Sequence, residues 1–300
     1  MSTYVFDNAW ESERARLTGL ESGLDAGTIR HLETLGVGAG WRCWEIGGGG
    51  GSIAAWLCER VGDGGHVLAT DLETTFLDRL PHANLAVRRH DIVADELPEG
   101  PFDLVHARWV LHWVPDRKGA LARMVAALRP DGWLLVEEPD FVTLFHGCAS
   151  EIVRKVVTVA VRATEAKSGA QSEYGRRLLD DIRAQGVVDV ESSGRIEMMR
   201  GGTPLCTHLR LSIAKVGATL VDSGAVDAEE LEEALARLED PAFATMSAIT
   251  MAVWGRRAAK SRGCNGRGAR ARPRVGRAAP MVIAGSRSAS SSRSTNPGAG

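Results

Sequence analysis

Apolar positions follow two periodicities along the first 140 residues. Residues 8–36 carry Leu and Ile at helical spacing, which predicts N-terminal helices with Asp25 as the cap of the second one. Short apolar runs that suit buried strands then alternate with segments that suit helices. The strands are predicted at residues 41–46, 66–70, 85–90, 102–107 and 133–137. Strands separated by helices of about ten residues predict an α/β fold with a parallel, doubly wound sheet.

The pattern changes after Pro139. Helical and alternating segments follow one another, and they predict a helical insertion after the fifth strand and two closing strands with two helices between them. We therefore expect a Rossmann-like sheet of seven strands. The segments are predicted as mainly helix at 142–184, strand at 187–198, helix at 205–220 and 228–238, and strand at 244–254.

These elements divide the chain into five expected regions. An N-terminal helical cap covers 1–40, the Rossmann-like core 41–140, a helical insertion over the substrate site 141–186, the closing strands with their helices 187–255, and a disordered basic tail 256–300. The tail consists mostly of Arg, Gly, Ala, Ser and Pro, which cannot bury enough apolar surface to offset the entropy of ordering.

Composition narrows the class of protein. Apolar residues make up 44% of the chain, yet none of its apolar runs approaches the roughly 18 residues that span a bilayer. The N-terminus has no basic region followed by an apolar run, so we expect no secretory signal and a cytoplasmic location. The five cysteines form no Cys-x-x-Cys pair, which favours reduced thiols over disulfides or a zinc site.

The charge is unevenly distributed. Residues 256–300 hold eleven of the 36 basic residues and none of the 38 acidic ones, which leaves 25 basic against 38 acidic residues and a net charge of −13 in the body. An acidic body gives no reason to expect nucleic acid as a partner. The basic tail could bind a polyanion, but we interpret it as an incidental extension because the folded pattern is complete at Trp254 and Gly255.

Five consecutive glycines follow the first predicted strand. Glycine lets a chain turn sharply and bring its backbone against a ligand. A dinucleotide fingerprint requires a glycine at the sixth position of its motif, where this chain has Ser52 or Ile53. The spacing that fits is acidic-x-Gly-x-Gly-x-Gly, formed by Glu45, Gly47, Gly49 and Gly51. In this spacing the chain resembles motif I of the class I methyltransferases, whose glycine loop lies against S-adenosylmethionine.

Two acidic residues at later strand ends extend the resemblance. It implies that Asp71 accepts both ribose hydroxyls, with Leu72 beside it, that Asp91 accepts from the adenine amino group, and that Ile92 covers the base. Arg108, after the fourth strand, is assigned to the same cofactor site. The resemblance covers residues 10–140 well and the final strands loosely. It is strongest to small-molecule methyltransferases of bacterial secondary metabolism, which include indole C3-methyltransferases.

The strand-four segment lacks the Asn/Asp-Pro-Pro-aromatic signature of enzymes that methylate nucleic-acid amino groups, so a flipped base is not the expected substrate. Eight Trp against two Tyr, with several aromatics near the expected site, favour a flat aromatic acceptor. The candidate acceptor-binding residues are Tyr4, Trp10, Trp109, Trp113, Phe141, Phe145 and His146. His112 and Glu138 are the candidate catalytic residues, because an acceptor that loses a proton benefits from a base.

The expected reaction is in-line methyl transfer from S-adenosylmethionine, giving S-adenosylhomocysteine, with C-methylation at indole C3 as the specific hypothesis. Three alternatives stay open: O- or N-methylation of another natural product, a non-methylating cyclase that binds the same cofactor, and an NAD-dependent oxidoreductase. Asp140 has no convincing partner for a magnesium site, so metal independence is expected. Helical caps in this family often pair, and a homodimer is compatible with the sequence.

Overall fold

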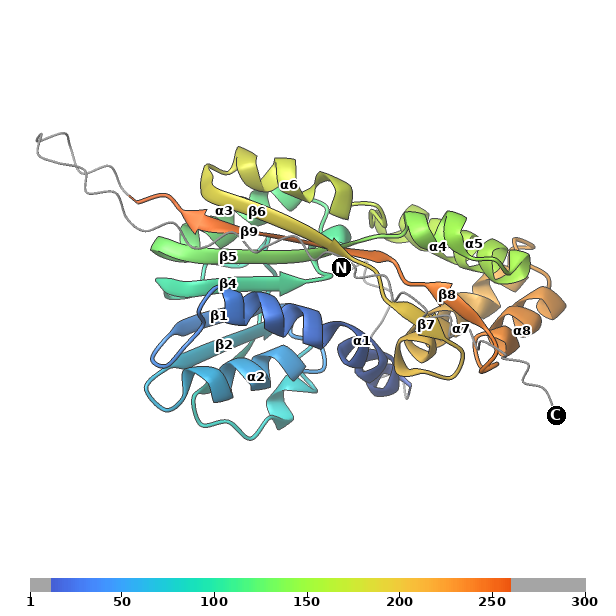
Figure 1. Ribbon diagram of the computed structural model, residues 1–300, viewed down its shortest axis with the longest axis horizontal. Coiled ribbons are helices and arrows are strands. Elements are labelled where there is room, and N and C mark those ends of the chain that lie inside the picture. The colour runs from blue at the N-terminus through green and yellow to red at the C-terminus, as the bar shows by residue number, and fades with distance from the viewer. Residues whose placement is uncertain (1–11, 260–300) are drawn as a thin grey trace, which may run out of the picture. The chain divides into compact units, whose positions relative to one another are not determined.

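Seven strands form one sheet in the computed structural model, which describes residues 12–259 (Figure 1). The strand order is β3-β2-β1-β4-β5-β9-β6, and a separate two-stranded sheet pairs β7 with β8. The strands are β1 Arg42–Ile46, β2 His66–Asp71, β3 Leu85–Arg89, β4 Phe102–Arg108, β5 Leu128–Asp140, β6 Val187–Arg195, β7 Met198–Arg200, β8 Ala244–Met246 and β9 Ile249–Arg257.

Eight α-helices and two short 3₁₀ helices connect the strands within residues 12–259. They are α1 Glu13–Thr34, α2 Ser52–Val61, α3 Arg117–Ala127, α4 Val142–Gly147, α5 Glu151–Ser168, α6 Gly175–Ala184, α7 Pro204–Asp222 and α8 Ala228–Arg237, with η1 Leu77–Arg79 and η2 Leu111–Trp113. The N-terminal helices expected from the sequence are one continuous helix here. Asp25 lies in its interior and caps nothing. None of the helices in this part of the chain is long and apolar enough to cross a membrane.

The sheet confirms the Rossmann-like fold predicted from the sequence. Strands β1 to β5 are parallel, and β9 runs antiparallel between β5 and β6. The chain proceeds outward from β1 to β2 and β3 on one side, then returns to β4 beside β1. The strand order therefore reverses between β1 and β4, and ligands of doubly wound sheets bind at the carboxyl ends of the strands at this point.

Both faces of the sheet are buried, because neighbouring residues of a strand point to opposite sides. On β4, Leu104 packs into the apolar cluster that contains residues of α1 and α2, whereas Val105 packs into the cluster with α3 and α6. Leu135 and Leu134 of β5 divide between the clusters in the same way. Because both faces of these strands are apolar, the strands could be predicted from short apolar runs in the sequence.

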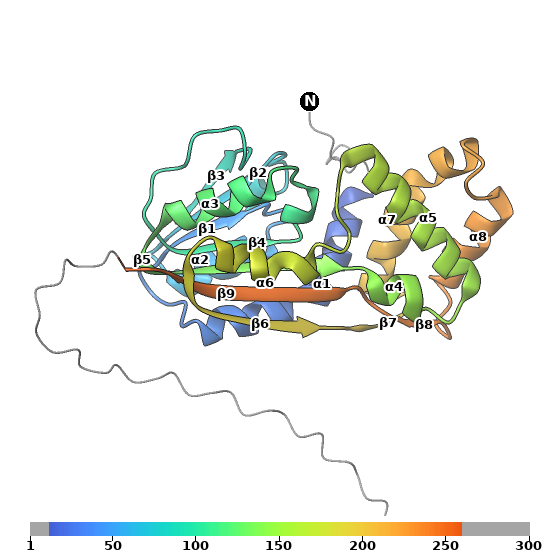
Figure 2. The ribbon, with the colours of Figure 1, turned by 90° about the horizontal axis from the view of Figure 1, so that it is seen from above.

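Four helices, α4, α5, α7 and α8, form a cap beyond the carboxyl ends of the strands (Figures 1 and 2). Their apolar residues share one cluster, which includes Val156, Leu209 and Ala234. The predicted insertion at 141–186 contributes only α4 and α5 to this cap. Helix α6 instead packs on the sheet, where Leu178 and Ile182 join the core, because these residues lie on one apolar stripe of the helix.

Candidate active site

A cavity of about 760 Å³ opens at the carboxyl ends of β1, β2 and β4 and continues beneath the cap. Its volume is in the upper part of the range for ligand pockets, roughly 300–1,000 Å³. One half is bordered by the glycine loop and by carboxylates at the strand ends. The other half is bordered by apolar side chains of α5 and α7, such as Val157 and Leu209.

The glycine loop after β1 has a conformation that only glycine adopts readily. Gly47, Gly49 and Gly51, the residues singled out by their spacing, have φ angles of 67°, 54° and 95°. A Cβ atom on Gly47 would lie 2.2 Å from Cγ2 of Val110. Gly47 and Gly49 line the cavity, whereas Gly51 packs under the loop against Leu80.

The backbone amides of Gly47, Gly48, Gly49 and Gly51 are engaged within the protein. Gly47 and Gly48 donate to the carbonyl oxygen of Thr70 at 2.7 and 3.1 Å, and Gly51 donates to the carbonyl oxygen of Gly48. The amide of Ser52, in the first turn of α2, faces Oε1 of Glu21 at 3.4 Å. A carboxylate therefore occupies the helix N-terminus, where a dinucleotide fold holds its pyrophosphate.

Asp71 and Asp91 both border the cavity. Oδ2 of Asp71 accepts from the amide of Gly49 at 2.9 Å, which ties the end of β2 to the glycine loop. Burial raises the pKa of Asp71, although hydrogen bonds from backbone amides counteract it. Oδ1 of Asp91 accepts from the amides of Val93 and Ala94 at 2.8 and 3.3 Å, so only Oδ2 is left for a ligand. Leu72 and Ile92 line the cavity next to them.

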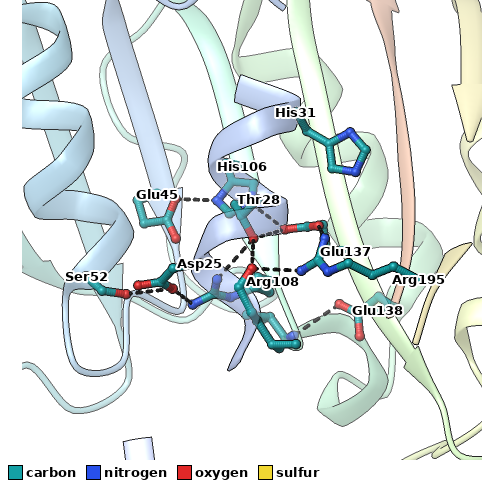
Figure 3. Close-up of polar contacts among 12 residues, drawn as sticks. Asp25, Thr28, His31, Glu45, Ser52, His106, Arg108, Glu137, Glu138 and Arg195 are labelled. Atoms are coloured by element: carbon teal, nitrogen blue, oxygen red, sulfur yellow. Dashed lines mark hydrogen bonds and ion pairs between the residues drawn. The ribbon is translucent and has the colours of Figure 1, made fainter. Parts of the chain in front are cut away.

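A buried chain of charges crosses three neighbouring strands below the cavity (Figure 3). Nδ1 of His106 on β4 lies 2.5 Å from Oε2 of Glu45 on β1, and its Nε2 lies 3.6 Å from Oε2 of Glu137 on β5. Burial alone would lower the pKa of His106, but the two carboxylates outweigh it and raise the pKa to about 9. Although burial opposes it, the nearby charge of His106 helps hold the pKa of Glu137 well below its usual value. The imidazolium thus fixes Glu45 at the edge of the cavity.

The same group of buried charged residues also links α1 to the sheet. Thr28 of α1 donates to Glu137 and accepts from Arg108 at 3.0 Å. Arg108 also forms an ion pair with Asp25 at 2.8 Å. Arg108 therefore both lines the cavity and braces β4 against α1, and its contact with the cofactor stays a prediction. Arg195 of β6 completes the cluster through Glu137, at 3.1 Å.

The loop after β4 is organised by Glu138. Its fully buried carboxylate accepts from the amides of Val110 at 3.0 Å, Leu111 at 2.6 Å and His112 at 3.1 Å, and from Nδ1 of His112 at 2.9 Å. Glu138 does not border the cavity, so it positions His112 and is not itself placed to take a proton from an acceptor. His112 does border the cavity. Its Nε2 has no hydrogen-bond partner among residues 12–259.

Trp109 stands at the junction of the two halves of the cavity. Its φ angle of 57° is unusual for a residue other than glycine, and such strain is retained where the surrounding structure over-determines it. The ring contacts those of Phe141, His112 and His208, with centroids 5.8, 6.2 and 6.2 Å apart. Its indole Nε1 is buried without a hydrogen-bond partner in the described part of the chain. Trp113 lines the cavity next to His112.

Other candidate acceptor-binding residues are placed elsewhere. Phe145 is buried in the cap under the guanidinium of Arg162, 4.7 Å away, and does not border the cavity. His146 is exposed at the end of α4 and is likewise outside the lining. Both follow Phe141, which does line the cavity, and the ring of Phe145 packs behind that of Phe141 with centroids 6.2 Å apart. Tyr4 and Trp10 lie outside the described residues, as does the tail from residue 260.

The sequence placed the 141–186 insertion, which contains α5, over the substrate site, but it indicated none of the lining residues of α5 and no contribution of α7. His208, Leu209 and Ile213 of α7 face the cavity, together with Val157 and Val161 of α5. The only available signal was the helical spacing of these residues, which a core helix shows equally. No group of three or more His, Cys, Asp or Glu side chains suited to a metal ion occurs between residues 12 and 259.

Comparisons with known proteins agree with this architecture. Residues 44–134 match the family model of a methyltransferase domain. Methyltransferase str2 of Strobilurus tenacellus is 31% identical over 178 residues, which cover 58% of this chain and 63% of that protein. Methyltransferase str3 of the same organism is 27% identical over 200 residues, covering 66% and 70%. The chain thus spans less than two thirds of str2.

Solved structures show the same fold. Phosphoethanolamine N-methyltransferase 2 of Haemonchus contortus, solved with phosphomonomethylethanolamine and S-adenosylhomocysteine, has a TM-score of 0.50 at 18% identity, covering 79% of this chain and 53% of its own. The YcgJ protein of Bacillus subtilis has a TM-score of 0.52 at 11% identity, covering 79% and 100%. Residues 44–134 thus match a methyltransferase domain, and the fold around them is the one seen in these solved structures.

Proposed function

We propose that this protein transfers the methyl group of S-adenosylmethionine to a small, flat, uncharged aromatic acceptor. The observation that carries the proposal is the continuity of one cavity between the acidic crevice at the strand ends and the apolar chamber under the cap. A donor bound in the crevice would present its reactive end near Trp109, where the chamber begins. The cavity would bring both reactants into one geometry, which is a main source of rate acceleration for such displacements.

Charge in the crevice favours a cationic ligand over a dinucleotide. Carboxylates outnumber guanidiniums among the lining residues by eight to three. Four of the five glycine amides of the loop are engaged within the protein, and Glu21 would repel a pyrophosphate at the start of α2. S-adenosylmethionine carries a sulfonium and an ammonium and has no phosphate. These features support it over NAD, with Asp71 receiving the ribose hydroxyls and Oδ2 of Asp91 the adenine amino group.

The chamber supports an apolar acceptor. Aliphatic side chains of α5 and α7 surround it, and the aromatic rings of Trp109, Trp113 and Phe141 border its entrance. A flat aromatic ring matches these surfaces, because aromatic pairs gain about 0.5–1.5 kcal/mol beyond their buried area. Indole, with C3 as the methylated atom, is the specific acceptor that we put forward within this class.

Bound S-adenosylmethionine would supply a methyl group on a positively charged sulfur leaving group. The acceptor atom forms the new carbon bond as the carbon–sulfur bond breaks, and a proton leaves the acceptor. We assign this proton to Nε2 of His112, because Glu138 holds the ring by Nδ1 and can stabilise the imidazolium. The apolar chamber would exclude water from the reacting atoms.

Calorimetric titration of the purified chain with S-adenosylmethionine and with NAD tests the donor assignment. We expect saturable binding of S-adenosylmethionine and none of NAD. A screen of indoles, phenols and aromatic amines with methyl-labelled S-adenosylmethionine, read by mass spectrometry, then identifies the acceptor and the methylated atom. Preferential binding of NAD, or binding of neither nucleotide, would contradict the proposal.

A further inference from the structure

His208 lies on α7 and borders the cavity. Helix α7 approaches α1 so closely that a Cβ on Gly19 would lie 2.3 Å from the carbonyl oxygen of Pro204. This close approach brings Nδ1 of His208 to 2.9 Å from the backbone carbonyl oxygen of Arg16. The ring also packs edge-on against Trp109, at the entrance of the apolar chamber.

This contact determines which nitrogen of His208 carries the proton. A carbonyl oxygen can only accept, so Nδ1 must be the donor of the pair. Burial, with a smaller contribution from the Arg16 guanidinium, lowers the pKa of His208 to about 3. The ring is therefore neutral at physiological pH, and its Nε2 carries a lone pair. This Nε2 has no hydrogen-bond partner in the part of the chain that the structure describes.

On α7 the cavity lining is aliphatic apart from His208 and Ser212, and the Ser212 hydroxyl donates to the carbonyl oxygen of His208. Leu205, Leu209 and Ile213 of α7 line the same wall. The nearest charge, on Arg16, is bound by Glu13 at 2.6 Å. Because His208 lines the cavity, its Nε2 can accept a hydrogen bond from a donor that a ligand supplies.

We propose that His208 is a positioning and specificity residue whose Nε2 accepts a hydrogen bond from an aromatic N–H or O–H group of the methyl acceptor. The inference rests on the proposed function and narrows its substrate class to neutral rings that carry such a donor. The bond orients the ring in the chamber and draws electron density toward its nucleophilic atom. A carboxylate-bearing ring would be rejected, because two lone pairs would then face each other.

His208 and His112, which both contact the ring of Trp109, would have different roles. Nδ1 of His112 is bound by a carboxylate, whereas Nδ1 of His208 is bound by a neutral carbonyl. A carboxylate partner stabilises an imidazolium and a carbonyl partner does so far less. His112 is accordingly suited to receive a proton, and His208 to hold a donor that keeps its proton.

The test uses pairs of probes of equal shape, with and without the donor. Indole is compared with indene, and 2-naphthol with 2-methylnaphthalene, by calorimetry on the full chain saturated with S-adenosylhomocysteine. We expect the donor-bearing probe of each pair to bind about tenfold more tightly. In His208→Phe the difference should fall below about twofold, while the donor-free probes keep their affinity. His208→Gln, whose amide oxygen can accept, should restore part of the difference.

His82→Phe, a substitution at a residue outside the cavity, is the matched control and should retain the full difference. Thermal melting of each variant verifies that it is folded. Equal affinity for the members of both pairs in the unaltered chain would overturn the inference, as would a difference that persists in His208→Phe or failure of all four probes to bind. A chain that did not bind S-adenosylhomocysteine at all would instead contradict the proposed function.

Discussion

Glu138 accepts two hydrogen bonds from His112, one from the ring at 2.9 Å and one from the backbone amide at 3.1 Å. Both end on the same oxygen, Oε2, while Oε1 accepts from the amides of Val110 and Leu111. One carboxylate from the end of β5 thereby fixes the loop after β4 and the orientation of the imidazole. This double contact leaves Nε2 as the ring atom that can act on a bound acceptor.

Replacing Glu138 with Gln should lower both stability and turnover. The amide NH₂ group would face backbone N–H donors in a fully buried site, which costs about 1–3 kcal/mol of unfolding free energy. We expect the methylation rate to fall at least tenfold because His112 loses its orienting partner, with the dissociation constant for S-adenosylmethionine within about threefold. Urea denaturation, calorimetry and single-turnover kinetics measure the three quantities. An unchanged rate would refute the positioning role.

The pKa of His106, raised to about 9, predicts a loss of stability in alkaline solution. In the unfolded chain the imidazole titrates near 6.5. Its contribution is fully present below that pH and is lost as pH rises through 9. The unfolding free energy should therefore drop by up to about 3 kcal/mol between pH 6.5 and 9.5. Urea denaturation at several pH values measures this decline.

His106→Gln is the reference for this experiment, since it lacks the titrating group. Thiols also titrate in this range, and burial raises the pKa of Cys43. The thiols contribute equally to the unaltered protein and to His106→Gln, so they cancel in the comparison. The difference between the chains should consequently shrink as pH rises. A difference that stayed constant from pH 6.5 to 9.5 would show that His106 is not held as an imidazolium.

Asp71→Asn should weaken binding of S-adenosylmethionine by about 10- to 100-fold, because a charged acceptor contributes roughly 1.5–3 kcal/mol per hydrogen bond. The side chain also receives the amide of Gly49, so part of the loss reflects a looser glycine loop. Asp63→Asn, at an exposed turn residue, provides the control. Equal affinities of the two variants in calorimetry would remove Asp71 from the donor site.

Gly47→Ala should be damaging and Gly64→Ala should be neutral. A Cβ on Gly47 would collide with Val110 and would sit on a backbone with a φ angle of 67°, whereas a Cβ on Gly64 would meet no atom within 4 Å. We expect Gly47→Ala to cost about 1–3 kcal/mol of unfolding free energy and to weaken donor binding. Thermal and urea denaturation of the two variants measures this difference. Equal stability would contradict the requirement for glycine at position 47.

The sequence was most informative where function depends on neighbouring residues. The apolar runs marked the parallel strands, and the alternate glycines that define the motif are the ones with positive φ angles. Asp71 and Asp91 could be placed at the cavity because parallel strands end at one edge of the sheet. Each inference needed only local pattern and the general geometry of the fold.

Side chains joined by distant packing could not be predicted. The approach of α7 to α1 depends on the absence of a side chain at Gly19, about 190 residues from His208, and no local pattern reports it. Asp25 was misjudged for the same reason: its partner Arg108 lies on another element, so the residue looked like a helix cap. Glu138 was expected to be a catalytic residue, but its neighbours place it behind the ring of His112 and outside the cavity lining.

The cap is connected to the sheet at one small place. Its first part leaves the sheet at the end of β5 and its second part leaves after β6 and returns at β9, where Pro139 pairs with Thr250 and Thr250 with Arg195. Pro139, Thr250 and Arg195 thus lie side by side on the adjacent strands β5, β9 and β6, so the junctions are neighbours in space. The cap segments could accordingly be exchanged for those of a related enzyme by splicing at these points, which would alter the choice of acceptor while the donor crevice stays intact.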